Sequence, residues 1–175
     1  MTKEFARPII AQLRGYLWHT TSVDGFRGIV SEKSIRVNRG DLPNAWDQSS
    51  CSNCFEENAV SLFDFVTHRD EDLVGEDLLL LQKWPGVMFR HRPTVFLGMA
   101  IESLASNLLF YSELKRRRGL GGVIPRIEVC HVGDIPWSTV KMVGISQGLS
   151  SPRIDFYSSV QAARDSLICD QNTNQ

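Results

Sequence analysis

The chain has 175 residues, of which 42% are hydrophobic and 22% are charged. This length and composition match one globular domain and exclude a disordered or fibrous chain. Lys and Arg together number 19 and Asp and Glu number 20, so the net charge of -1 excludes a global attraction to nucleic acid or membrane. We expect a single domain over residues 1–170, followed by a disordered polar tail at 171–175.

The lack of a recognisable targeting signal and the small number of cysteines favour a reducing compartment. The N-terminal segment lacks the apolar stretch of a signal peptide, and nowhere do about 18 apolar residues follow one another. We therefore expect a cytoplasmic protein with no membrane contact, whose four cysteines are reduced thiols. Cys51 and Cys54 have metal-knuckle spacing, and Cys130 with His131 would complete a zinc site. A single CxxC without a second pair favours a polar loop and no bound metal.

Hydrophobic spacing and turn residues define the expected elements. In chain order these are a strand at 15–20, a helix capped by Ser22, a strand at 34–38, a long loop at 39–58, a strand at 59–65, a helix at 76–84, strands at 87–89 and 94–101, a helix at 102–118, strands at 123–132 and 140–145, and a helix at 158–168. Strands and helices do not alternate regularly, which predicts the α+β class.

Two of these strands carry polar groups on a defined face. Alternation places Ser61 and Phe63 on one face of their strand. In the strand that ends near residue 132, Glu128 falls on the face opposite Ile127 and Val129. Taken alone, such a glutamate is an edge-strand charge that points to solvent. A functional role requires partners elsewhere in the chain.

Three short segments supply such partners in order. Leu17–Ser22 contains His19 and precedes a glycine-containing helix, Ala59–Phe63 contains Ser61, and Arg126–Trp137 contains Glu128 followed by a polar turn and Ile-Pro. Together they resemble the ADP-ribosyltransferase-fold family: its His-Thr opening, its central strand and its catalytic-glutamate strand. The last segment is most similar to the DarT-like nucleic-acid-targeting toxins and related prokaryotic defence proteins. The order and spacing of the segments carry the resemblance.

The resemblance implies an ADP-ribosyltransferase-like split β-sandwich of two antiparallel sheets flanked by helices, with NAD as co-substrate in the cleft between them. It implies that the dinucleotide is bound by His19, Thr20, Thr21, Ser61 and Phe63. His19 would contact the adenosine-side ribose and act as the distant partner of Glu128 in catalysis. Glu128 would stabilise the positive charge that develops on the ribose when the nicotinamide bond breaks.

The chain departs from the family pattern at two positions. Ser61 stands where the His-Tyr-Glu subgroup has tyrosine. Arg126 stands two residues before the glutamate, where arginine-modifying members carry Gln or Glu, so arginine is a less favoured acceptor. DarT-like enzymes carry an arginine in the pocket, and the candidates for this residue here are Arg36, Arg39 and Arg69.

A basic segment precedes the glutamate strand and a glycine-rich turn. Its members are Lys115, Arg116, Arg117 and Arg118, and together with Arg126 they are candidates for binding the phosphates of a nucleic acid. An equally weighted alternative is that the basic residues only end a helix, where the helix dipole favours cations.

The sequence thus predicts an NAD-dependent ADP-ribosyltransferase that modifies a macromolecule, with DNA or RNA favoured over protein. By analogy, it would be a toxin or anti-phage effector with an antitoxin partner. Two alternatives stay open: an RNA 2′-phosphotransferase, which also consumes NAD, and a non-catalytic binding module or inhibitor on the same fold.

Overall fold

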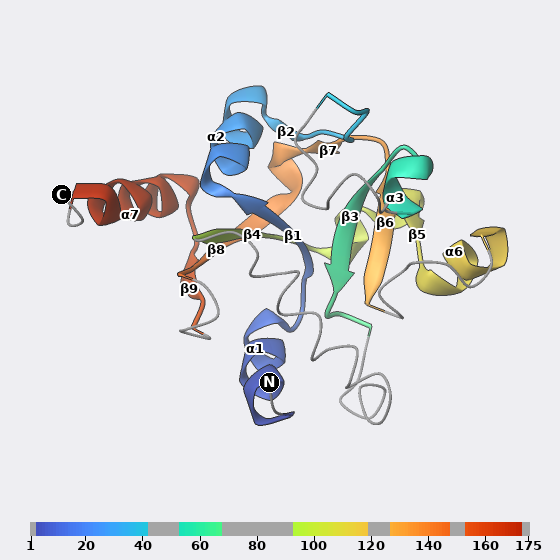
Figure 1. The fold of residues 1–175 in the computed structure, drawn as a ribbon, viewed down its shortest axis with the longest axis horizontal. Coiled ribbons are helices and arrows are strands. Elements are labelled where there is room, and N and C mark those ends of the chain that lie inside the picture. Colours follow the sequence, from blue (N-terminus) through green and yellow to red (C-terminus); the bar gives the residue numbers. More distant parts are fainter. Residues whose placement is uncertain (1–2, 42–52, 68–92, 119–126, 148–152, 173–175) are drawn as a thin grey trace.

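The computed structural model describes residues 3–41, 53–67, 93–118, 127–147 and 153–172. Its helices are α1 (Lys3–Leu13), α2 (Val23–Glu32), α3 (Asn53–Glu56), α6 (Tyr111–Arg118) and α7 (Val160–Asn172). Its strands are β1 (Leu17–Ser22), β2 (Ser34–Ile35), β3 (Ala59–Asp64), β4 (Thr94–Met99), β5 (Leu108–Leu109), β6 (Glu128–Val132), β7 (Ile135–Pro136), β8 (Val140–Ser146) and β9 (Asp155–Tyr157). The predicted α+β class is confirmed (Figure 1). No helix in the described ranges is long and apolar enough to cross a membrane.

The main sheet is antiparallel and has seven strands in the order β5-β6-β3-β1-β4-β8-β9, while β2 and β7 form a separate pair. Its strands are unevenly connected. β1 pairs with β4 at six positions but with β3 only at Leu17–Asp64 and Trp18–Phe63. We call these two pairs the seam. Instead of two separate large sheets, the structure has one sheet whose halves, β5-β6-β3 and β1-β4-β8-β9, join along this seam.

Apolar side chains pack on both sides of the sheet. Helices α2 and α7 contribute Phe26, Ala163 and Leu167 to the larger core, which also contains Leu62 of β3. Helix α1 lies near the start of β1 (Figure 1). Its residues pack with Trp18, Phe63 and Phe96 in a second core. The alternation predicted for β3 is confirmed, because Leu62 and Phe63 belong to different cores.

Helix α2 follows β1 directly, and local chemistry determines both of its ends. Ser22 has an extended backbone, and its Oγ accepts a hydrogen bond from the Gly25 amide at 3.0 Å, which confirms the predicted N-cap. Asp24 lies in the first turn, where the helix dipole favours an acid. The helix ends at Lys33 in the left-handed region, whose amide bonds to the Ile29 carbonyl.

The helix predicted over 102–118 is wrong in its first half. That half contains two 3-10 turns, at Ile101–Ser103 and Ala105–Asn107, and the short strand β5. Leu108 and Leu109 pair with β6, so backbone bonding at the sheet edge replaces the helical bonds that the apolar spacing suggests. Only α6 is helical.

Other elements differ from expectation or lie outside the described residues. Helices α1 and α3 and strand β9 were not predicted. Helix α7 continues to Asn172, past the predicted domain boundary at residue 170. The predicted helix at 76–84 and strand at 87–89 lie outside the described residues, as do residues 173–175.

The packing of Trp18 against Gly98 gives a test of the seam. Gly98 of β4 pairs with Trp18, and a Cβ atom there would lie 2.8 Å from the indole ring. The ring cannot retreat easily, because it is buried and its Nε1 donates to the Leu13 carbonyl at 2.6 Å. We expect Gly98→Ala to lower the free energy of unfolding by about 1–3 kcal/mol, measured by urea denaturation.

Gly28→Ala is the matched control, because a Cβ atom at Gly28 in α2 meets nothing within 4 Å. Alanine favours a helix over glycine, so this variant should be neutral or up to about 1 kcal/mol more stable. Equal stability of the Gly98→Ala variant and the unmodified protein would contradict the close packing of Gly98 against Trp18.

Candidate active site

Glu128 is the first residue of β6, and only 8% of it is exposed. It pairs with Phe63 of β3 and lies inside the protein, so the reading of a solvent-directed edge charge is wrong. Burying a carboxylate costs free energy unless hydrogen bonds offset the loss of water. Ser61 supplies such a bond: its Oγ donates to Glu128 Oε1 at 2.6 Å. A bond of this length to a carboxylate is charge-assisted and strong.

The β3–β6 register explains this contact. Ser61 pairs with Cys130 and Phe63 pairs with Glu128, so Ser61 is the diagonal neighbour of Glu128 on the same face of the sheet. Cys130 is on this face too, two residues after Glu128. The alternation of β3 therefore delivers the Ser61 hydroxyl to the carboxylate.

His19 lies one residue beyond the seam, where β1 no longer pairs with β3. Its Nδ1 is 3.1 Å from the Ser61 carbonyl oxygen, and it donates there in the tautomer that carries the proton on Nδ1. A side chain thus bonds to β3 just past the last paired residue of β1. His19, Ser61 and Glu128 form one series of contacts, although they are 42 and 67 residues apart in the chain.

The other predicted NAD contacts divide into two groups. Thr20 and Thr21 follow His19 in β1 and are both partly exposed. A Cβ atom at Gly25 would lie 2.1 Å from Thr21 Oγ1, so the Thr21 side chain packs against the first turn of α2. Phe63 is 6% exposed and belongs to the second core. Thr20 is thus the neighbour of His19 in β1, while Thr21 also contacts α2 and Phe63 also packs in the second core.

Cys54 of α3 and Cys130 of β6 form a disulfide, with Cα atoms 5.4 Å apart and both side chains fully buried. The expectation of reduced thiols is wrong for these two residues, because α3 packs on β3 and β6 and brings Cys54 over the strand. The Sγ of Cys54 also lies 3.8 Å from Glu128 Oε1. No group of three or more potential metal ligands occurs among the described residues, and Cys51 lies outside them.

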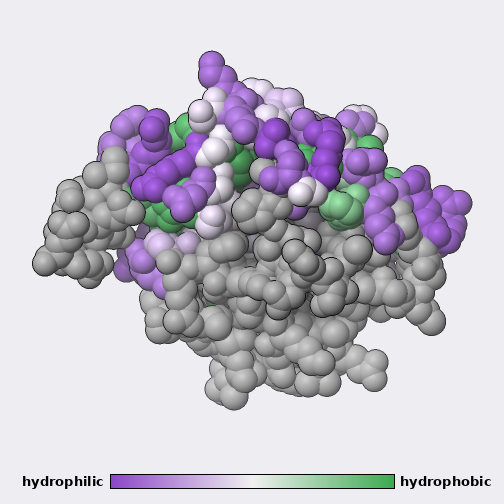
Figure 2. Space-filling model, turned by 45° about the horizontal axis from the view of Figure 1, so that its top comes forward, coloured by the Kyte–Doolittle hydropathy of each residue, from purple (hydrophilic) through white to green (hydrophobic). Residues whose placement is uncertain are grey.

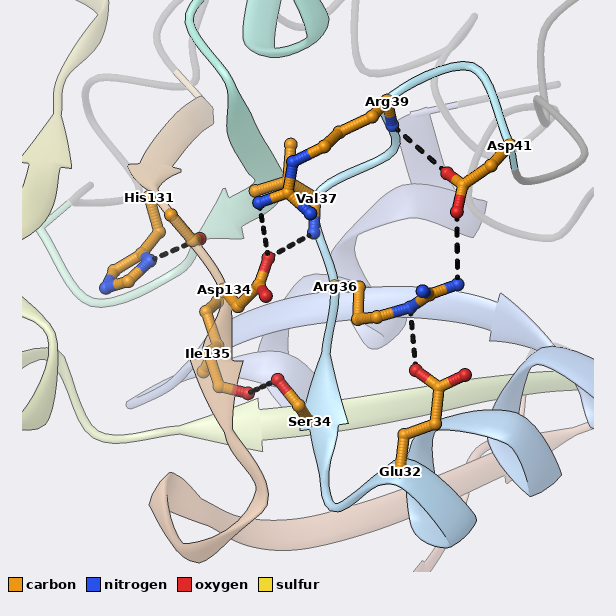
Figure 3. Close-up of polar contacts among 10 residues, drawn as sticks. Glu32, Ser34, Arg36, Val37, Arg39, Asp41, His131, Asp134 and Ile135 are labelled. Atoms are coloured by element: carbon orange, nitrogen blue, oxygen red, sulfur yellow. Dashed lines mark hydrogen bonds and ion pairs between the residues drawn. The ribbon is translucent and has the colours of Figure 1, made fainter.

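Two of the three candidate pocket arginines contact acids around β2 and β7 (Figure 3). Arg36 pairs with Glu32 at 2.6 Å and with Asp41 at 3.4 Å. Arg39 lies 3.6 Å from Asp134, whose Oδ1 also accepts the Val37 amide at 2.8 Å. The two contacts to Asp134 hold the segment after β2 onto the β6–β7 turn, and the Arg36 pair with Glu32 connects the segment to α2. The third candidate, Arg69, lies outside the described residues.

The β6–β7 turn places this network beside the end of β6. Gly133 has a φ of +83°, a conformation that favours glycine, and its amide donates to the Asn58 carbonyl at 3.0 Å. His131, 4% exposed, has its Nδ1 3.2 Å from the Gly133 carbonyl, so its role is structural. Hydrophilic side chains predominate over the described surface at this end of the molecule, with smaller hydrophobic areas between them (Figure 2).

The basic segment ends α6, a position that is compatible with both readings of these residues. Arg117 contacts Glu113 at 2.8 Å and Glu57 at 3.1 Å, and Arg116 lies 3.7 Å from Glu113. The hydrogen bond to Glu113 raises the pKa of Arg117 above its ordinary value. Two of the five predicted phosphate contacts, Arg116 and Arg117, thus already pair with the protein's own acids. Arg126 lies outside the described residues, as do the side chains of Lys115 and Arg118.

No family model, curated protein or solved structure matches the chain. A proposal for its function therefore depends on the geometry described above.

Sequence reasoning missed the contact of the cysteine pair with Glu128. One signal was present: Cys130 is two residues after Glu128, so a strand places both on one face. No local pattern shows that Cys54, 76 residues before Cys130, packs on that face.

Reduction of the disulfide should lower stability, because the bond closes a long loop and thereby restricts the unfolded chain. We expect the free energy of unfolding to fall by about 2–4 kcal/mol and the melting temperature by about 5–15 °C after treatment with a phosphine reductant. Differential scanning calorimetry of the oxidised and reduced protein measures this change. The Cys54→Ala variant is the control, and its melting temperature should not respond to the reductant. An equal melting temperature of the two forms of the unmodified protein would contradict a stabilising bond.

Proposed function

We propose that the protein is an NAD-dependent ADP-ribosyltransferase in which Glu128 is the key carboxylate and His19 its partner in binding NAD. The observation that supports this proposal most is the bond of 2.6 Å from Ser61 Oγ to Glu128 Oε1, together with the contact of His19 to the Ser61 carbonyl. The three residues singled out by the family resemblance form one connected group, although nothing in their local sequence requires it.

The chemistry of NAD cleavage suits this group. Loss of nicotinamide builds positive charge on the ribose, and a preorganised carboxylate in a site of low dielectric constant stabilises that charge better than one in water. Ser61 fixes the orientation of one carboxylate oxygen, so less reorganisation is needed during the reaction. Glu128 is buried, and an ionised carboxylate in such a position is costly for a purely structural residue.

The proposal includes an ADP-ribosyltransferase-like fold with NAD bound where the halves of the sheet diverge. The narrow seam supports it, since β1 stops pairing with β3 directly before His19. Thr20 would contact the dinucleotide from the same strand. Ser61 would lie near the nicotinamide ribose because it bonds to Glu128.

We propose nucleic acid, in preference to protein, as the acceptor of the ADP-ribose. The basic end of α6 supports this choice, although Arg116 and Arg117 contact acids of the chain. Both are at least 43% exposed in their side chains, so a phosphate can reach them. A toxin or anti-phage role with an antitoxin partner belongs to the same proposal and depends on analogy to the DarT-like proteins.

Glu128→Gln tests the carboxylate. The amide keeps the size of the side chain but removes its charge, so we expect nicotinamide release from NAD to fall by about 100-fold to 1000-fold. Chromatography of nicotinamide measures the rate, and thermal melting checks the fold. Glu102→Gln, a change of an exposed acid in the 3-10 turn after β4, should retain full activity.

The same reactions with labelled NAD and added DNA, RNA or protein identify the acceptor. Label that appears in nucleic acid with the unmodified protein but not with Glu128→Gln supports the proposal in full. Equal nicotinamide release by both proteins would rule it out, and removal of a 2′-phosphate from RNA would favour the phosphotransferase instead.

His19→Ala tests the NAD-binding partner. We propose that His19 binds NAD equally well in the ground state and in the transition state. Its loss should therefore raise the KM for NAD about tenfold and change kcat little. His19→Asn can keep a donor toward the Ser61 carbonyl and should retain more affinity than alanine. Steady-state kinetics separate the two constants. A fall in kcat with an unchanged KM would show that His19 acts on the reaction step and not on NAD binding.

A further inference from the structure

The cysteine pair is part of the site as well as a cross-link. Cys54 Sγ is 3.8 Å from the same oxygen, Glu128 Oε1, to which Ser61 donates. Cys130 is the residue that pairs with Ser61 across β3 and β6. The disulfide therefore adjoins Glu128 through the sulfur of Cys54, and its other cysteine is the cross-strand partner of Ser61. A change in the covalent state of the sulfurs must alter the surroundings of the carboxylate.

We propose that Cys54 and Cys130 are a reversible thiol–disulfide pair that controls Glu128, with NAD cleavage favoured in the disulfide form. The effect on NAD cleavage depends on the function proposed above, whereas the coupling of the pair to the carboxylate does not. Glutathione is a suitable class of reductant: two molecules are oxidised to one glutathione disulfide, and the S–S bond becomes two thiols that carry the two protons.

The first consequence of reduction is a new hydrogen-bond donor. A disulfide sulfur carries no proton, whereas a thiol at Cys54 can donate to Glu128 Oε1 across the observed 3.8 Å. Oε1 then accepts from Ser61 and Cys54 together. The added thiol donor occupies a further lone pair of Oε1, so it reduces the ability of the carboxylate to bind ribose hydroxyls and to stabilise positive charge.

The second consequence is the loss of a tether. Helix α3 has only four residues, and one helical turn is not stable without tertiary contacts. Its contacts to β3 and β6 and the bond from Cys54 to Cys130 hold it over the Glu128 face of the strands. Local opening of so short a helix gives glutathione access to sulfurs that are buried in the closed state.

The test uses a protein in which only this pair of cysteines remains, made by Cys51→Ser and Cys169→Ser. It is equilibrated in a series of glutathione buffers, and alkylation followed by mass spectrometry measures the disulfide fraction. In the same samples, carbon-13 NMR records the side-chain carboxyl resonance of Glu128, assigned by its loss in Glu128→Gln. Nicotinamide release is measured in parallel.

Two variants at one position separate the two consequences. Cys54→Ser cannot form the disulfide but keeps a donor toward Oε1, so it should behave like the reduced form at every glutathione ratio. Cys54→Ala removes both the tether and the donor. If the donor dominates, Cys54→Ala is the more active of the two; if the tether dominates, both are equally impaired.

We expect the Glu128 resonance and the rate to follow the disulfide fraction, with nicotinamide release about tenfold faster in the oxidised form, as for the loss of one hydrogen bond to a charged group. A Glu128 resonance that stays constant while the disulfide fraction changes would overturn the inference, and so would a pair that glutathione cannot reduce. A resonance that moves without nicotinamide release in either form would support the coupling and overturn the proposed function.

Discussion

Between β1 and β3, the halves of the seven-stranded sheet are joined by only two strand pairs, Leu17–Asp64 and Trp18–Phe63, and the candidate site depends on where this pairing stops. β1 pairs with β4 along its whole length, so the β4 side of the sheet determines its direction. Trp18 fills the space at this junction, where Gly98 leaves room for its ring. At the next residue of β1, the side chain of His19 contacts the Ser61 carbonyl of β3. The seam therefore determines where His19 lies relative to Ser61.

The second constraint is the buried carboxylate of Glu128. An apolar residue would satisfy the packing of β6 at lower cost, because a buried charge must regain in hydrogen bonds what it loses in hydration. Ser61 supplies one such bond and is itself located by the β3–β6 register. Sites where a chain departs from the simplest stable choice are often functional. Here this costly residue is the β6 partner of Phe63, which belongs to the seam.

Local chemistry made much of this arrangement predictable. The Ser22 cap, the alternation of β3 and the placement of Glu128 within a strand follow from neighbouring residues alone. The rest depends on contacts distant in sequence. Strand β5 forms inside an expected helix because Leu108 and Leu109 find β6 at the sheet edge. The seam and the cysteine pair, whose members are 76 residues apart, arise only when the strands assemble.

The cover over Glu128 shows the same dependence on long-range contacts. Helix α3 is too short to be stable alone, yet it lies against β3 and β6 (Figure 1). The disulfide from Cys54 fixes one side of it, and Arg117 of α6 contacts Glu57 directly after it at 3.1 Å. An exposed ion pair contributes little stability, about 0–1 kcal/mol, so the disulfide is the stronger of the two attachments. The position of α3 over the carboxylate therefore depends mainly on the disulfide, and reduction of this bond would leave α3 with only the weaker attachment.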